Sequence, residues 1–90
     1  MESQFEIIVY GRVQGVGFRA AARKQARMLN LRGWVENLPD RTVRIVVGGD
    51  QESCMRFSKW CRAGSGFSWV ERITIKEMKP EILEAFSIRY

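Results

Sequence analysis

The chain has 90 residues, of which 46% are hydrophobic and 11% aromatic, and its formal net charge is +5. This length has room for one hydrophobic core, and the composition is unlike that of disordered chains, so we expect a single folded domain over residues 1–90. The positive charge favours an anionic partner, either a phosphorylated metabolite, nucleic acid or an acidic surface, but it is equally consistent with plain solubility.

Cysteine use and hydropathy indicate where the protein works. Cys54 and Cys61 are seven positions apart, which on one helix separates them by about 10 Å, too far for a disulfide. Unpaired cysteines are typical of a reducing compartment. The sequence has no signal-peptide pattern and no apolar run long enough to span a bilayer, so we expect a cytoplasmic protein without a membrane partner.

In the first half of the chain, β-forming runs alternate with one amphipathic stretch. The runs rich in β-formers occupy residues 5–10, 33–37 and 42–47. Between the first two runs, apolar residues recur on one face of a helix over residues 18–29: Phe18, Ala22, Ala26 and Leu29. A proline-containing turn at residues 38–41 joins the later two runs, which predicts a β-hairpin.

The second half predicts a helix and two strands. Cys54, Phe57 and Cys61 recur at helical spacing after Asp50, which indicates a core-facing stripe that ends before the glycines of residues 64–66. Residues 70–79 and 86–90 read as strands. The resulting order, β-α-β-β-α-β plus a short terminal strand, is the split βαβ or ferredoxin-like arrangement, an α+β fold whose antiparallel sheet carries two helices on one face.

A glycine-rich loop between the first strand and the first helix is the candidate binding site. Residues 11–19 read GRVQGVGFR. Glycines let the backbone approach a ligand, and the N–H groups of such a loop converge on an anion at the positive end of a helix dipole. Arg19 ends the loop with a planar guanidinium that matches a phosphate. The loop therefore predicts a phosphate cradle.

Two nucleotide-binding alternatives fit this sequence less well. Residues 15–20 formally match the dinucleotide pattern G-x-G-x-x-A, and Glu36 and Asp40 follow about twenty residues later. That pattern belongs to a larger doubly wound sheet, which the hairpin does not build. RNA-recognition modules carry exposed aromatics on a central strand, whereas residues 42–47 have none, so we expect no nucleic-acid partner.

Few residues could act as nucleophiles or metal ligands. The chain has no histidine, which excludes a phosphohistidine or an imidazole base. A cysteine phosphatase needs an arginine six positions after its cysteine, but Trp60 and Phe67 stand at those positions after Cys54 and Cys61, which we interpret as core residues. No cluster has metal-ligand spacing. Any chemistry would thus depend on positioning and electrostatics, without a metal.

Three segments together resemble the acylphosphatase family. The loop GRVQGVGFR is similar to its N-terminal signature, residues 33–40 (GWVENLPD) resemble its second signature, and residues 86–90 (FSIRY) resemble its usual end. The resemblance covers nearly the whole chain. It implies a ferredoxin-like sandwich that hydrolyses acyl phosphates to a carboxylate and inorganic phosphate, with no metal or cofactor.

The resemblance also implies the site residues. The catalytic arginine corresponds to Arg19 and the catalytic asparagine to Asn37. The phosphate-binding loop, which would act through its backbone N–H groups, comprises Gln14, Gly15, Val16, Gly17 and Phe18. Physically, Arg19 can neutralise charge on a transferring phosphoryl group, and the Asn37 amide can orient a water. The alternative for Asn37 is a strand-end residue that favours the turn after it.

Three positions depart from the family pattern. Arg41 stands where a glycine is common, which points to another turn type and adds a cation near the end of the sheet. Ala20 stands where a large aromatic is common, and Gly66 where the loop often has a proline. These differences concern substrate preference and loop rigidity.

The sequence thus predicts a monomeric, metal-free acylphosphatase whose partner is a small acyl phosphate. A non-catalytic acylphosphatase-like domain that binds an anion or regulates a partner is the alternative. One further hypothesis is that the C-terminal carboxylate of Tyr90 holds Arg19.

Overall fold

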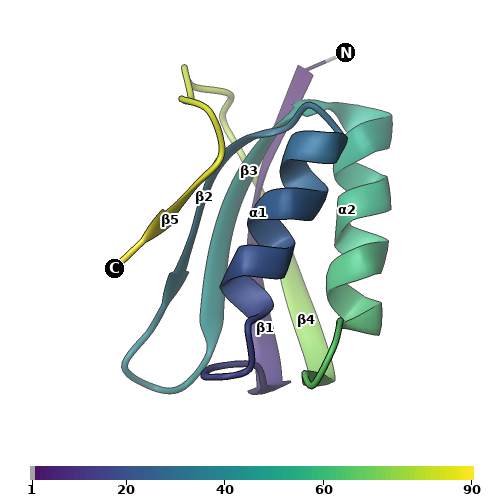
Figure 1. Cartoon of the computed structure of the whole chain (residues 1–90). Coiled ribbons are helices and arrows are strands. Elements are labelled where there is room, and N and C mark those ends of the chain that lie inside the picture. Colours follow the sequence, from purple (N-terminus) through teal and green to yellow (C-terminus); the bar gives the residue numbers. More distant parts are fainter. Residues whose placement is uncertain (1) are drawn as a thin grey trace.

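The computed structural model describes residues 2–90 as a five-stranded sheet with two helices (Figure 1). In chain order the elements are β1 (Glu2–Arg12), α1 (Phe18–Met28), β2 (Arg32–Asn37), β3 (Val43–Asp50), α2 (Gln51–Ala63), β4 (Trp69–Met78) and β5 (Ser87–Arg89). This order confirms the βαββαβ arrangement with a short terminal strand. The first and third strands are longer than the sequence indicated, and β3 continues through two glycines to Asp50.

The sheet is mixed, because its last strand runs parallel to its neighbour. The strand order is β4-β1-β3-β2-β5, and β1 to β4 pair antiparallel as predicted. β5 lies parallel to β2, with Ser87 opposite Trp34. The expected fully antiparallel sheet is therefore wrong at this one edge. Residues 79–86 keep the chain at the end of the sheet where β4 finishes, so β5 runs back in the same direction as β2 (Figure 1).

Both helices cover the same face of the sheet and enclose the core (Figure 1). The predicted helical stripes are confirmed, since the buried residues of the helices are Phe18, Ala22 and Ala26 on α1 and Cys54, Phe57 and Cys61 on α2. Leu29, the last member of the first stripe, is only partly buried against the core. Trp60 covers the edge of the stripe, as expected, with its ring centroid 5.4 Å from that of Phe18. This aromatic contact fixes the first turn of α1, where the glycine loop ends.

The turn between β2 and β3 closes tightly around Arg41. The Leu38 N–H donates to the Thr42 carbonyl at 2.9 Å, and the Arg41 N–H donates to the Leu38 carbonyl at 3.1 Å. The Asp40 carboxylate accepts from the hydroxyl and from the N–H of Thr42, and these bonds lower the pKa of Asp40. Arg41 has a φ of 73°, in the left-handed region that favours glycine. The chain therefore places an arginine in a backbone conformation that glycine adopts more easily.

This backbone conformation predicts that Arg41→Gly stabilises the protein. Relief of the left-handed strain outweighs the extra freedom of glycine in the unfolded chain, and we expect the free energy of unfolding to rise by about 0.5–1 kcal/mol. Urea denaturation measures this as a higher midpoint at constant m. Arg41→Ala is the control, because it removes the same charge but keeps a Cβ. Equal stabilisation by both variants would contradict the conformational explanation and implicate charge repulsion.

The loop between α2 and β4 also contains a departure from the family pattern. Gly66 has a φ of 54°, which a proline cannot adopt. The loop is nevertheless held internally, because the Ser68 hydroxyl accepts from the Ser65 N–H at 2.8 Å and donates to the Ser65 carbonyl at 2.6 Å. A side-chain bridge thus takes the place of a rigid proline in ordering this loop.

Candidate active site

The glycine loop, residues 13–17, lies between β1 and α1 at the end of the sheet where the β2–β3 turn also lies (Figure 1). Gly15 and Gly17 have φ values of 72° and 81°, whereas Gln14 and Val16 do not have positive φ. A Cβ at either glycine would meet nothing within 4 Å. Backbone conformation rather than space therefore requires glycine here. Such alternation is how consecutive N–H groups come to face one anion.

The Gln14 side chain fastens this loop to the β2–β3 turn. Its Nε2 donates to the carbonyls of Leu38 and Thr42, each at 2.8 Å. Leu38 directly follows Asn37 in the chain, so the loop and the asparagine are held together by these two bonds. Sequence analysis placed Gln14 in the loop only for its backbone and missed this role. The contact spans 24 residues to Leu38, and no local pattern signals it.

Asn37 ends β2 and carries an unsatisfied polar atom. Its Oδ1 is buried and has no hydrogen-bond partner among residues 2–90. An orphaned buried acceptor costs about 1–3 kcal/mol, so it is rare without a functional reason. A residue retained only for turn formation would use this oxygen to accept from the turn backbone. In this turn Asp40 does so instead, which argues against the turn-forming interpretation of Asn37.

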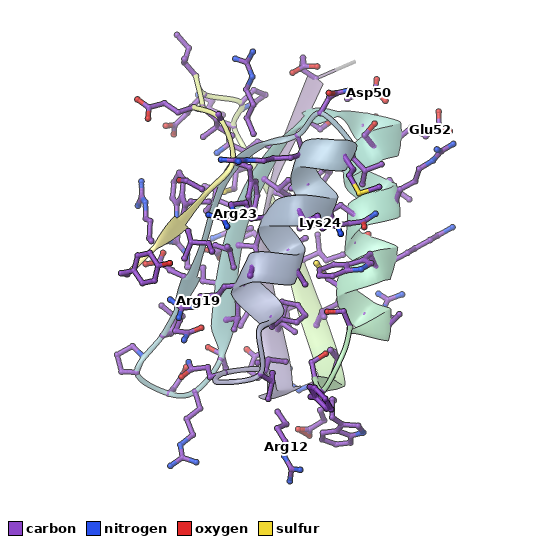
Figure 2. All side chains as sticks on the ribbon, in the orientation of Figure 1. Arg12, Arg19, Arg23, Lys24, Asp50 and Glu52 are labelled. Atoms are coloured by element: carbon purple, nitrogen blue, oxygen red, sulfur yellow. The ribbon has the colours of Figure 1, made fainter. Side chains whose placement is uncertain are left out.

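Arg19 lies in the first turn of α1. No ion pair joins it to a carboxylate in the described part of the chain, residues 2–90. Its guanidinium instead lies over the Tyr90 ring, with Cζ 5.1 Å from the ring centroid. Figure 2 shows it at the lower end of α1, one turn before Arg23. The hypothesis that the Tyr90 carboxylate holds Arg19 is therefore replaced by a cation–π contact, which positions the side chain and leaves its N–H groups free to donate.

A small depression of about 160 Å³ forms between the loop, α1 and β5. Gly15, Gly17, Arg19, Ala20 and Tyr90 are among the residues that line it. Ala20 is exposed, so the helix start is open, as its small size implied.

A second depression of about 600 Å³ adjoins the first and shares Val13 and Gly15 with it. A larger depression of about 890 Å³ lies between the start of β1 and residues 80–83, and its lining contains no residue of the glycine loop. Asn37 is not among the residues that line any of these three depressions. We therefore place the candidate site at the smaller pair of depressions.

The two cysteines are core residues, as predicted. Burial raises the pKa of the Cys54 thiol to about 11, with smaller contributions from the acidic Glu2 and Asp50. Burial alone raises the pKa of Cys61 still further. Both thiols stay protonated near neutral pH, so neither is a nucleophile.

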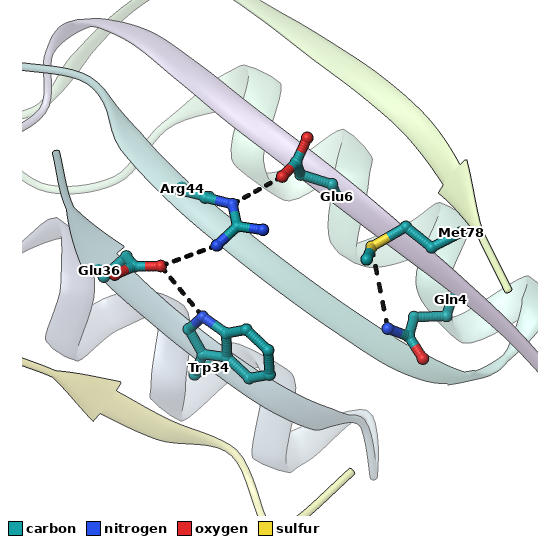
Figure 3. Close-up of polar contacts among 6 residues, drawn as sticks. All are labelled: Gln4, Glu6, Trp34, Glu36, Arg44 and Met78. Atoms are coloured by element: carbon teal, nitrogen blue, oxygen red, sulfur yellow. Dashed lines mark hydrogen bonds and ion pairs between the residues drawn. The ribbon is translucent and has the colours of Figure 1, made fainter. Parts of the chain in front are cut away.

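The sheet face opposite the helices carries paired charges. Arg44 Nε donates to Glu6 at 2.6 Å and its Nη1 to Glu36 at 3.1 Å, which raises the pKa of Arg44 (Figure 3). Trp34 Nε1 donates to the same Glu36 carboxylate at 3.2 Å (Figure 3). Arg89 covers the Trp34 ring at 3.6 Å. Arg44 is thus matched by acids, Arg72 and Arg89 are stacked on rings, and the acids repel phosphates.

Two further observations concern metals and membranes. Among residues 2–90, no group of three or more His, Cys, Asp or Glu side chains is close enough to hold a metal ion. Within the same residues, neither helix is long and apolar enough to cross a membrane.

Comparison with known proteins identifies relatives that are similar to this chain in sequence and in fold. The family model described as Acylphosphatase matches residues 5–88. The curated acylphosphatase of Thermococcus kodakarensis is 45% identical over 80 residues, which cover 89% of this chain and 88% of that protein. The crystal structure of acylphosphatase from Bacillus subtilis superposes with a TM-score of 0.94 at 41% identity, and the match covers 100% of both chains. A similar fold covers all of this chain but 12% of full-length HypF, at a TM-score of 0.89 and 25% identity.

Proposed function

This chain belongs to the acylphosphatase family, and from that premise we propose how its residues hydrolyse the carboxyl–phosphate bond of acyl phosphates. Arg19 and the glycine loop hold the phosphoryl group, and Asn37 holds the attacking water. The observation that carries this assignment is the buried Asn37 Oδ1 without a partner, on the segment that Gln14 joins to the loop.

The loop and Arg19 bind the phosphoryl group by complementary means. The N–H groups of residues 14–18 donate to its oxygens at the N-terminus of α1, where the helix dipole favours a negative charge. Arg19 adds a full positive charge and a planar pair of donors. Since no carboxylate in the described chain competes for Arg19, its charge is available to the phosphoryl oxygens as they gain charge in the transition state.

Asn37 orients the water for in-line attack. Its Oδ1 accepts a hydrogen bond from the water, whose lone pair then points at phosphorus. The water oxygen forms a bond to phosphorus while the bond between phosphorus and the acyl oxygen breaks. The products are a carboxylate, inorganic phosphate and one proton. A carboxylate is a good leaving group because its acid has a pKa near 4, so the reaction needs no strong base and no histidine.

The proposal also covers the oligomeric state, the location and the binding partners of the enzyme. We propose a metal-independent cytoplasmic monomer that binds neither nucleic acid nor a membrane. Two buried, unpaired cysteines suit a reducing compartment. Charged residues along the edge strand β4, among them Glu71, Arg72, Lys76 and Glu77, disfavour edge-to-edge pairing. The acids beside Arg44 make the open sheet face a poor surface for a nucleic-acid backbone.

Hydrolysis of benzoyl phosphate, followed by its ultraviolet absorbance, tests this function. We expect turnover that is the same with and without a chelator, because only side chains and backbone N–H groups hold the phosphoryl group. A protein-free reaction measures spontaneous hydrolysis. The alternative is a non-catalytic acylphosphatase-like domain that binds an anion or regulates a partner. Calorimetric binding of inorganic phosphate with no turnover would establish that alternative and contradict the proposal.

A further inference from the structure

The second depression beside the glycine loop has room for more than a phosphoryl group. Its volume is about 600 Å³, and it is lined by residues 11–15, by Arg41 of the β2–β3 turn and by Trp69 of β4. It shares Val13 and Gly15 with the depression at Arg19. A substrate whose phosphoryl group lies in the loop can therefore extend its acyl group across Gly15 into this space.

Two arginines line this depression. Arg12 and Arg41 are both exposed, and within residues 2–90 neither guanidinium makes an ion pair, a side-chain hydrogen bond or a cation–π contact. Arg44 and Arg56 are paired with glutamates, and three other arginines, Arg23, Arg32 and Arg62, make no ion pair within residues 2–90. What distinguishes Arg12 and Arg41 is that both line this depression. Figure 2 shows Arg12 extending beyond the end of the sheet, away from the other elements. Two unneutralised cations beside a phosphate site favour a ligand with additional negative charge.

Arg41 occupies its position at a cost in backbone energy. The left-handed conformation at φ 73° disfavours any residue with a Cβ by about 1–2 kcal/mol. The neighbouring Asp40 carboxylate is already bonded to Thr42 and does not hold Arg41. Within residues 2–90 no ion pair or hydrogen bond of this guanidinium offsets the strain, and strained backbone of this kind clusters at active sites and ligand-binding positions.

A β-bulge precedes the position where Trp69 of β4 pairs with Arg12, so an aromatic residue lies beside this arginine. The pairing of β1 with β4 shifts register between Tyr10 and Gly11. Gly11 makes this possible, since a Cβ there would lie 2.2 Å from the Trp69 carbonyl oxygen. Bulges commonly redirect side chains beside active sites. Trp69 is 62% exposed and lines the depression, where its indole can pack against the carbon skeleton of an acyl group.

We infer that this depression is an acyl-group subsite that selects acyl phosphates whose acyl group carries a second negative charge. Arg12 and Arg41 bind that second anion, and Trp69 contacts the apolar part between the two charges. The inference rests on the proposed function, because it assigns the phosphoryl group to the glycine loop. It narrows the substrate from acyl phosphates in general to those with an anionic acyl group.

Two substrates that differ by one carboxylate test the subsite: benzoyl phosphate and 4-carboxybenzoyl phosphate. The readout is selectivity, the ratio of their kcat/KM values. Arg41→Gly suits the backbone of the turn and therefore still folds, and we expect it to lower the selectivity for the anionic substrate about threefold. Combination with Arg12→Gln should lower it about tenfold, whereas Arg41→Lys should keep it within about twofold. Differences in intrinsic reactivity cancel, because each variant is compared on the same pair.

Lys79→Gln is the matched control. It removes one exposed positive charge just after β4, at the end of that strand opposite Trp69, and it should leave the selectivity unchanged. An equal loss of selectivity in Lys79→Gln and Arg41→Gly would overturn the inference in favour of a general charge effect. Unchanged selectivity in the double variant, with benzoyl phosphate still hydrolysed, would overturn it while the proposed function stands.

Calorimetry with non-hydrolysable analogues separates a failure of the subsite from a failure of the proposed function. We expect 4-carboxybenzoylphosphonate to bind more tightly than benzoylphosphonate. In the double variant, the ratio of their two dissociation constants should fall by the same factor as the selectivity. This measurement does not need turnover. Equal affinities of the two phosphonates for the unmodified protein would overturn the subsite even if neither acyl phosphate were hydrolysed.

Discussion

Arg19→Gln lowers kcat/KM for benzoyl phosphate by about 10³-fold or more. The substitution keeps a polar side chain of similar length but removes the positive charge that no carboxylate in the described chain offsets. A single arginine that stabilises a transferring phosphoryl group, or a single oxyanion donor, contributes an effect of this size. The loop N–H groups remain, so we expect the variant to retain residual activity above the spontaneous rate. Steady-state kinetics with benzoyl phosphate measure the loss.

Arg23→Gln provides the matched control for this result. Arg23 lies one turn further along α1, so its loss changes the net charge equally without touching the loop (Figure 2). We expect its activity to stay within about threefold of the unmodified enzyme, because a partly exposed charge one turn away from the loop acts only weakly. Thermal unfolding of both variants checks that they fold. Retention of more than a tenth of the activity by Arg19→Gln, or an equal loss in Arg23→Gln, would contradict the assignment of Arg19.

Asn37→Ala loses about 10²–10³-fold in kcat while the protein becomes no less stable. The orientation of the water is lost, which lowers kcat. Arg19 and the loop still bind the phosphoryl group, so KM changes little. The buried Oδ1 accepts no hydrogen bond from residues 2–90, so its removal breaks no hydrogen bond within that part of the fold. We therefore expect the free energy of unfolding to stay constant or to rise by up to about 1 kcal/mol.

The two readouts separate catalysis from turn formation at Asn37. If Asn37 only favoured the turn, its replacement would lower stability and leave kcat nearly intact, which would contradict the catalytic assignment. The chain's other asparagine, Asn30, is the control. It has a left-handed φ of 58° after α1. Asn30→Ala should lose about 0.5–1 kcal/mol of stability and keep full activity, the opposite combination.

The sequence by itself determined the elements, the loop and the family. Helical stripes such as Phe18, Ala22 and Ala26 are visible because their period is set within one element. The glycines at 15 and 17 are likewise a local requirement, since their left-handed backbone needs no distant contact to explain it. The family follows from contiguous signatures for the same reason. These features are encoded over a few residues and do not depend on how the elements pack.

The tertiary structure alone decided the contacts that complete the site. The Gln14 side chain meets carbonyls 24 and 28 residues away, and Arg19 meets an aromatic ring at the other end of the chain. The sequence suggested the Tyr90 carboxylate in that place. It could not show which group of Tyr90 meets Arg19, because that depends on the register and direction of β5, which pairs parallel to β2. Arg41 shows the same limit: its identity does not indicate a left-handed backbone, which the structure shows within a turn closed by hydrogen bonds across the hairpin. The orphaned Asn37 oxygen is the clearest case, since only the packing around an atom decides whether it finds a partner.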